Sequence, residues 1–130
     1  MENVKKTFIV ANWKSNMTES EVKGWLAEFS IEELDVVNKE IIICPPFTLL
    51  LDLKAYFSNK SSVKIGAQDI SPMDEGAYTG GINGRQIKEL ADFVIVGHSE
   101  RRKNFSETEE MINQKIDQAL NSGLDRKSVV

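Results

Sequence analysis

The sequence contains one cysteine, Cys44, and one histidine, His98. A single cysteine cannot form a disulfide within the chain, and without a Cys/His cluster no zinc site is expected. Long apolar runs are also missing, because the longest, Ile41–Leu51, is interrupted by two prolines and is too short to cross a bilayer. Met1–Val10 lacks the apolar core of a signal peptide. We therefore expect a soluble, cytoplasmic protein without a metal ion.

A strong excess of one charge is absent too. The chain has 16 basic and 20 acidic residues, a net charge of −4, which gives no electrostatic reason to expect nucleic acid or an anionic membrane as a partner. Apolar residues make up 41% and charged residues 28%, close to the average for globular proteins. The 130 residues suit one ordinary domain and are far fewer than the roughly 250 of a closed eight-stranded α/β barrel.

Short apolar runs without alternation predict strands that are buried on both faces. The runs are Thr7–Ala11, Ile41–Cys44, Val63–Gln68 and Phe93–Val96. Between and after them, apolar residues recur at helical spacing. The predicted helices lie over 22–29, over Phe47–Phe57 and over 111–120, the last ending at Gly123. Strands separated by helices predict an α/β fold of four βα units around a parallel sheet.

Polar residues mark where helices begin. Thr18 with Glu21 and Ser106 with Glu109 have the spacing of capping boxes, and Asn83 is a further candidate cap. Residues 69–84 form a long, turn-rich connection with four glycines, and connections of this length are more often functional than accidental.

In a parallel α/β sheet, function gathers beyond the carboxyl ends of the strands. Strand one delivers Asn12 and Lys14 there, and strand four delivers His98. A lysine suits a phosphate or carboxylate group, and a histidine can act as an acid, a base or a neutral donor. The spacing alone also fits a solvent-exposed lysine, a structural histidine and a solvated helix start at residues 99–102.

Six short motifs agree in order and spacing with one known family. They are Asn12–Lys14, Pro45–Pro46, Gly66–Asp69, Gly76–Gly80, Gly97–Arg102 and Phe105–Glu109. With them the chain resembles triosephosphate isomerase from Phe8 to Leu124. The resemblance implies that residues 1–124 are the N-terminal half of a TIM (β/α)8 barrel, and that residues 125–130 form a tail outside the family pattern.

The resemblance also implies a function, namely the interconversion of dihydroxyacetone phosphate and glyceraldehyde 3-phosphate through an enediolate, in glycolysis and gluconeogenesis, with no cofactor or metal. Asn12 and Lys14 would contact the substrate, and Lys14 would offset its negative charge. His98 would polarise the carbonyl and move protons between the two oxygens. Glu100 would support the catalytic pair of Lys14 and His98.

By the same resemblance, Tyr78 and Thr79 lie at the tip of the 69–84 loop and insert into a second subunit of a homodimer. Gly81 stands where the family usually has a glutamate that helps this contact, which weakens the inference. The residues themselves also fit a flexible glycine-rich loop. Gly80, Gly81 and Gly84 resemble a phosphate cradle before a helix, a weak pattern that the family resemblance does not support.

The end of the sequence departs from the family. Asp125–Val130 resembles neither the family's fifth strand nor a cap, and the general-base glutamate, the lid and the phosphate-binding loops that follow in the family are absent. Glu107, Glu109 and Glu110 are not expected to replace that base, because their helix would pack outside the barrel. We therefore expect this chain alone to have no meaningful isomerase activity.

A half-barrel is expected to leave strands one and four as open edges and to expose side chains meant for the barrel interior. The alternative to an enzyme is therefore a non-catalytic interaction module that self-associates or docks on a full-length subunit. A third possibility is a pair of halves that retains phosphate binding through Lys14.

Overall fold

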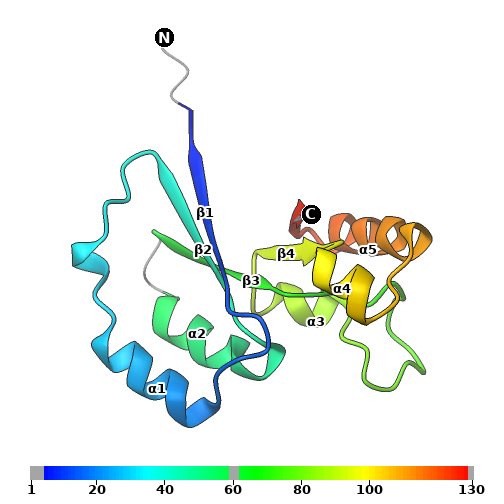
Figure 1. Ribbon diagram of the computed structural model, residues 1–130, viewed down its shortest axis with the longest axis horizontal. Coiled ribbons are helices and arrows are strands. Elements are labelled where there is room, and N and C mark those ends of the chain that lie inside the picture. The colour runs from blue at the N-terminus through cyan, green and yellow to red at the C-terminus, as the bar shows by residue number, and fades with distance from the viewer. Residues whose placement is uncertain (1–4, 59–61, 129–130) are drawn as a thin grey trace.

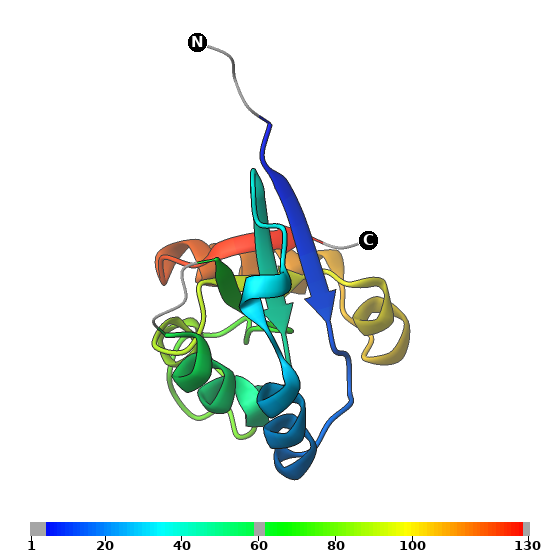
Figure 2. The same cartoon turned by 90° about the vertical axis from the view of Figure 1, so that its left-hand side faces the viewer.

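A computed structural model describes residues 5–58 and 62–128, which form one five-stranded parallel sheet in the order β1-β2-β3-β4-β5 (Figure 1). The strands are β1 Thr7–Asn12, β2 Lys39–Cys44, β3 Val63–Ala67, β4 Phe93–Val96 and β5 Asp125–Ser128. The sheet is strongly twisted, so that β5 runs across behind β1 in Figure 2. The predicted α/β class is confirmed, since alternating strands and helices with a curled parallel sheet correspond to half of a TIM barrel.

Helices connect the strands, as the periodicity predicts. They are α1 Glu19–Glu28, α2 Leu50–Phe57, α3 Gly84–Lys88, α4 Ser99–Asn104 and α5 Glu109–Asn121, with 3-10 turns η1 Ile31–Glu33 and η2 Phe47–Leu49. Helix α4 directly follows β4, so two helices separate β4 from β5. Within the described ranges, no helix combines the length and the apolar character needed to cross a membrane.

Two of the three predicted helix caps are confirmed. The Thr18 side chain accepts the Glu21 N–H at 3.3 Å, but Glu21 Oε1 contacts the Thr18 hydroxyl and not its backbone N–H, so Thr18 is a cap without the predicted reciprocal box. Asn83 forms a reciprocal capping box with Gln86. The capping box predicted for Ser106 is wrong, because Thr108 caps α5 instead and accepts the Met111 N–H at 3.2 Å. Ser106 has a φ of 54°, in the left-handed region that an N-cap does not adopt, and it serves the turn between α4 and α5.

The sheet has a buried cluster on each face. The larger one packs the helices onto the sheet; its members include Val22, Ile43, Leu50, Leu53, Ile65, Val94, Ile112 and Ala119. The smaller one consists of Ile42, Cys44, Phe93 and Ile95, all no more than 6% exposed. The expected exposure of barrel-interior side chains is therefore wrong for β2 and β4. Exposed apolar side chains are found on β1 instead.

The expectation that strand four is an open edge is also wrong, because β5 pairs with β4 over Phe93–Val96. The segment after Leu124 does form a strand at Asp125–Ser128; Val129 and Val130 lie outside the described residues. Leu124 is 3% exposed and anchors the turn, and the Asp125 N–H then bonds the Asp92 carbonyl at 3.0 Å. Strand pairing uses backbone groups, so a segment without apolar alternation joins the sheet once it is held beside an open edge. The boundary at residue 124 between family domain and tail stays a prediction.

Candidate active site

Three segments converge where β1, β3 and β4 end. A small cavity of about 160 Å³ lies there. Its lining consists of Asn12, Lys14, Ser15, Gln68, Ile95, His98, Glu100, Arg101 and Phe105. The structure therefore brings together the four residues that the sequence nominates for chemistry, from segments more than eighty positions apart in the chain.

The backbone at Lys14 is held in an unusual conformation. Lys14 has a φ of 57°, which is unfavourable for a residue with a side chain. Two side chains stabilise it: Asn12 Oδ1 accepts the Lys14 N–H at 2.9 Å, and Gln68 Nε2 donates to the Lys14 carbonyl at 2.9 Å. Gln68 Nε2 also donates to the Cys44 carbonyl at 2.9 Å, and so ties the end of β1 to the end of β2. The lysine is thus positioned by its surroundings.

The Lys14 ammonium meets a carboxylate. Its Nζ lies 2.5 Å from Glu100 Oε1, and the two side chains are 55% and 44% exposed. The hydrogen bond from Lys14 holds the pKa of Glu100 below its ordinary value. An ion pair this exposed adds little to stability, so its consequence is the placement of charge beside the cavity.

His98 is the N-cap residue of α4, and its Nδ1 accepts the Glu100 N–H at 3.1 Å. When Nδ1 accepts this bond, Nε2 is the ring nitrogen that carries a proton and can donate it to another group. The side chain is only 13% exposed. His98 therefore offers an Nε2–H donor from a largely buried ring, a group suited to polarising a carbonyl.

Behind the cavity lies a charged cluster that the sequence interpretation missed. Arg101 contacts Asp69 at 3.1 Å and Glu107 at 3.0 Å, while Lys115 contacts the same two carboxylates at 2.8 and 2.6 Å. We call Asp69, Arg101, Glu107 and Lys115 the quartet. It connects the end of β3 to α4 and α5, and so holds in place α4, the helix that His98 caps.

Glu107 lies in the turn between α4 and α5, and its side chain is only 1% exposed. Burial alone would raise the pKa of Glu107, but hydrogen bonds from Lys115 and Arg101 outweigh it and hold the pKa below its ordinary value. A signal was available in the sequence: Lys115 falls within the apolar stripe of α5, between Ile112 and Ala119. A lysine in such a stripe needs a buried partner.

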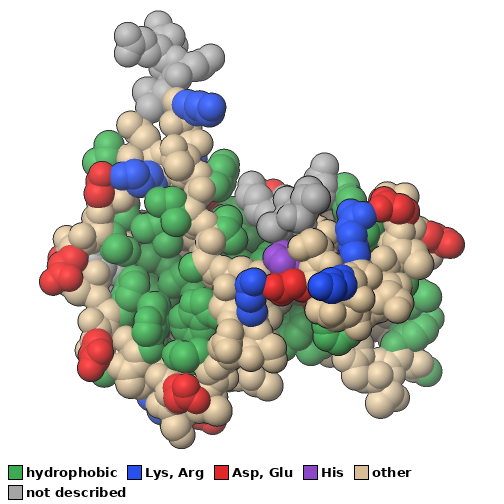
Figure 3. All heavy atoms as spheres, in the orientation of Figure 1, with side chains coloured by type: hydrophobic (Ala, Val, Ile, Leu, Met, Phe, Trp, Pro, Cys, Tyr) green, Lys and Arg blue, Asp and Glu red, His purple; other side chains and the backbone are tan. Residues whose placement is uncertain are grey.

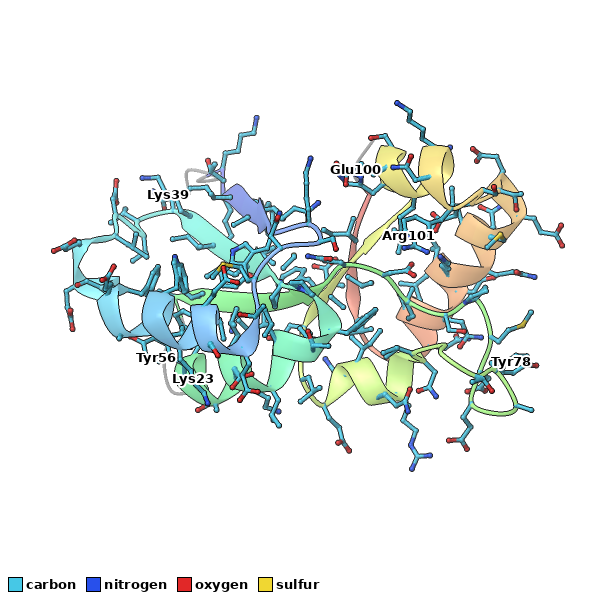
Figure 4. The ribbon with its side chains drawn as sticks, turned by 60° about the horizontal axis from the view of Figure 1, so that its bottom comes forward. Lys23, Lys39, Tyr56, Tyr78, Glu100 and Arg101 are labelled. Atoms are coloured by element: carbon cyan, nitrogen blue, oxygen red, sulfur yellow. The ribbon has the colours of Figure 1, made fainter. Side chains whose placement is uncertain are left out.

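Tyr78 and Thr79 are not brought to the cavity. Figure 4 places Tyr78 in the 69–84 loop, far from Glu100 and Arg101. The Tyr78 side chain is 50% exposed, and the loop is closed locally by the bond from the Gly81 N–H to the Tyr78 carbonyl at 2.8 Å. Within one chain, this loop and the cavity are separate features.

Among the residues that the structure describes, no three or more His, Cys, Asp or Glu side chains are grouped so as to hold a metal ion.

The family model for triosephosphate isomerase matches residues 7–127. A triosephosphate isomerase of Dehalococcoides mccartyi is 44% identical over 121 residues, which are 93% of this chain and 47% of that protein. Those of Dictyoglomus thermophilum and Alkaliphilus metalliredigens are 44% and 38% identical over 122 residues, 93% of this chain and 49% and 48% of theirs. The chain spans about half the length of these curated relatives.

Proposed function

The chain belongs to the triosephosphate isomerase family, and from this premise we propose that it contributes half of a site for interconverting dihydroxyacetone phosphate and glyceraldehyde 3-phosphate through an enediolate. The observation that supports the proposal is the convergence of Asn12, Lys14, His98 and Glu100 on one cavity. An ammonium and an imidazole donor that line one cavity suit a substrate that carries a phosphate and a carbonyl group.

Each residue has a role that follows from its bonds. Lys14 offsets the charge of the phosphate and of the enediolate. His98 donates from Nε2 to the carbonyl oxygen and moves protons between the two oxygens. Asn12 keeps its amide nitrogen for the substrate, since its oxygen already accepts from Lys14. Glu100 is a positioning residue, because it holds the Lys14 ammonium.

We further propose that the 130 residues alone do not complete the reaction. Glu100 is the only carboxylate among the described residues that line the cavity, and a paired carboxylate with a lowered pKa is a poor base for a carbon-bound proton. A positioned base typically contributes about 10²–10⁴-fold. The cavity of about 160 Å³ is also smaller than the roughly 300–1,000 Å³ of complete ligand pockets.

One titration tests both parts of this proposal. Dihydroxyacetone phosphate added to the purified chain should shift the NMR signals of the His98 ring, while a coupled assay on the same samples records only background turnover. In Lys14→Ala the affinity for dihydroxyacetone phosphate, measured by this titration, should fall about tenfold or more, because a charge-assisted contact is lost. Lys23→Ala, which removes an exposed lysine of α1, is the matched control and should change nothing. Signals that do not move, or that move equally in Lys14→Ala, would refute the binding, and turnover near that of an intact family enzyme would refute the inactivity.

A second role is favoured by the exposed tip of the 69–84 loop, where Met73 is 39% and Tyr78 50% exposed. We infer that Tyr78 and Thr79 bind a second subunit, either another copy of this chain or a full-length isomerase. Co-migration with an intact isomerase in size-exclusion chromatography should weaken in Tyr78→Ala and persist in Leu51→Ala, a change on the exposed side of α2. Co-migration that is absent, or indifferent to Tyr78, would contradict this role.

A further inference from the structure

A second cavity, of about 400 Å³, shares no residue with the candidate active site. The end of α2, the start of β3 and the turn from α3 to β4 line it, and all of its lining residues lie between positions 54 and 92. The candidate active site lies where the strands end, so the two cavities are at opposite ends of the sheet. The volume falls within the roughly 300–1,000 Å³ of ligand pockets. We call this space the lysine cavity, after the three lysines that line it.

Much of the lining of the lysine cavity is apolar. Phe57, Val63, Ile65 and Ala91 line it and are no more than 5% exposed, and Leu90 beside them is partly buried. These side chains are members or neighbours of the cluster that packs the helices onto the sheet, so core packing fixes their positions. A preformed apolar lining can cover the body of a ligand without first being reorganised.

The three lysines are Lys54, Lys64 and Lys88. None of them forms an ion pair with a carboxylate of the described residues, whereas lysines elsewhere on the surface, such as Lys23 and Lys39, are paired. On the face drawn in Figure 3, most basic side chains likewise lie next to acidic ones. The lysine cavity therefore gathers ammonium groups whose charge no carboxylate of the described residues neutralises directly.

Two of the ammonium groups are held in place by uncharged partners. Lys54 Nζ donates to the Glu89 carbonyl oxygen, and Lys88 Nζ donates to the Gly123 carbonyl oxygen at 3.1 Å. An ammonium has three donors, so each of these lysines keeps two for a ligand. Glu89 and Asp92 also line the cavity, and two carboxylates against three lysines leave one positive charge in excess, although the chain has a net charge of −4.

We propose that the lysine cavity binds a small organic phosphate, whose phosphate group meets the lysines and whose apolar body lies on Phe57 and Leu90. Lysine binds phosphate as a compact point charge, whereas a planar carboxylate is matched best by the fork of an arginine. Among the described residues, no arginine lines this cavity. The site lies apart from Lys14 and His98, so it does not rest on the functions proposed above.

Titration of the purified chain with phenyl phosphate, followed by NMR at constant ionic strength, tests the site. Phenyl phosphate should shift the amide signals of Leu90 and Ala91 and saturate them in the low millimolar range. Inorganic phosphate should bind at least about tenfold more weakly, because it has no body to cover the apolar lining. Phenol, which has the ring without the charge, should also bind at least about tenfold more weakly.

Lys54→Gln/Lys88→Gln should lower the affinity for phenyl phosphate at least about tenfold, because two charge-assisted contacts are lost. Both side chains are exposed, so the fold should survive, which circular dichroism verifies. If the double variant does not fold, Lys64→Gln and the two single variants provide the same comparison, each with a smaller loss of affinity. Lys23→Gln, which changes a paired lysine of α1, is the matched control and should leave the affinity unchanged.

Lys14→Ala separates the lysine cavity from the candidate active site. It should leave the shifts of Leu90 and Ala91 unchanged, because Lys14 lines only the other cavity. Signals that do not move, equal affinities for phenyl phosphate and inorganic phosphate, or shifts that Lys14→Ala abolishes would each overturn the proposal. Affinities that no substitution of the three cavity lysines lowers would overturn it too.

Discussion

Replacing Lys115 with methionine should lower the free energy of unfolding by about 3–5 kcal/mol, the usual cost of removing one partner from a buried ion pair. The Lys115 side chain is 2% exposed, and its ammonium bonds both Asp69 and Glu107. Without it, Arg101 alone faces two carboxylates, and one negative charge stays uncompensated in a poorly solvated place. Methionine fills nearly the same space, so the loss reports charge rather than packing. Urea denaturation measures this change in the free energy of unfolding.

A matched control is Lys23→Met in α1. Lys23 pairs with Glu19 at 3.1 Å, but these side chains are 67% and 65% exposed, so the change should cost no more than about 0.5 kcal/mol. The double variant Lys115→Met/Glu107→Leu should recover most of the loss, because it removes one charge of each sign and leaves the Arg101–Asp69 pair at 3.1 Å. A Lys115→Met chain as stable as the wild type would contradict the burial of the quartet.

Acid should weaken the same buried interaction, because it protonates Glu107. The pKa of Glu107 is lower in the folded chain than its ordinary value of 4.5, so the stabilisation is complete above that value and is lost as the pH falls through the lowered folded pKa. In Lys115→Met the pKa of Glu107 loses one of its two lowering partners. The unfolding free energy of that variant should therefore depend less on acid than that of the wild type.

The quartet also shows where sequence reasoning ends. Strands β1 to β4, most helix positions and the convergence of Lys14 with His98 follow from local patterns and from the rule that parallel strands end on one side of a sheet. The partners of Lys115 do not, because Asp69 lies 46 positions away and only the fold sets that distance. The lysine in an apolar stripe signalled a buried charge, but not which carboxylates would meet it.

Two other differences between the sequence prediction and the structure have local causes. Thr108 rather than Ser106 caps α5, because the turn after α4 places Ser106 in the left-handed region, a tertiary demand that the capping pattern does not contain. Strand β5 was missed because its sequence, Asp125–Ser128, has no apolar alternation. Its pairing is a matter of backbone groups and of the open β4 edge beside it. Side-chain patterns are least informative where backbone hydrogen bonds and backbone conformation determine the local structure.

Replacing Gly84 with alanine should destabilise the chain by about 2–3 kcal/mol, although helix propensity alone predicts a gain of about 0.5–1 kcal/mol. Gly84 is the first residue of α3 and is buried against the end of α5. A Cβ there would lie 2.0 Å from the Ser122 Oγ, 2.8 Å from its Cβ and 3.2 Å from the Gln118 carbonyl oxygen. Part of this obstacle is backbone, which cannot move aside as a flexible side chain does.

Gly24 provides the same substitution without the obstacle. It lies within α1, and a Cβ there would meet no atom within 4 Å, so Gly24→Ala should stabilise the chain by about 0.5–1 kcal/mol. Ser122→Gly removes the two closest atoms, and Gly84→Ala/Ser122→Gly should therefore cost less than the sum of its single changes. Equal effects of alanine at positions 24 and 84 in urea denaturation would mean that propensity decides at both sites. Opposite signs would show that the close approach of α3 to α5, which a helix pattern does not reveal, requires glycine at position 84.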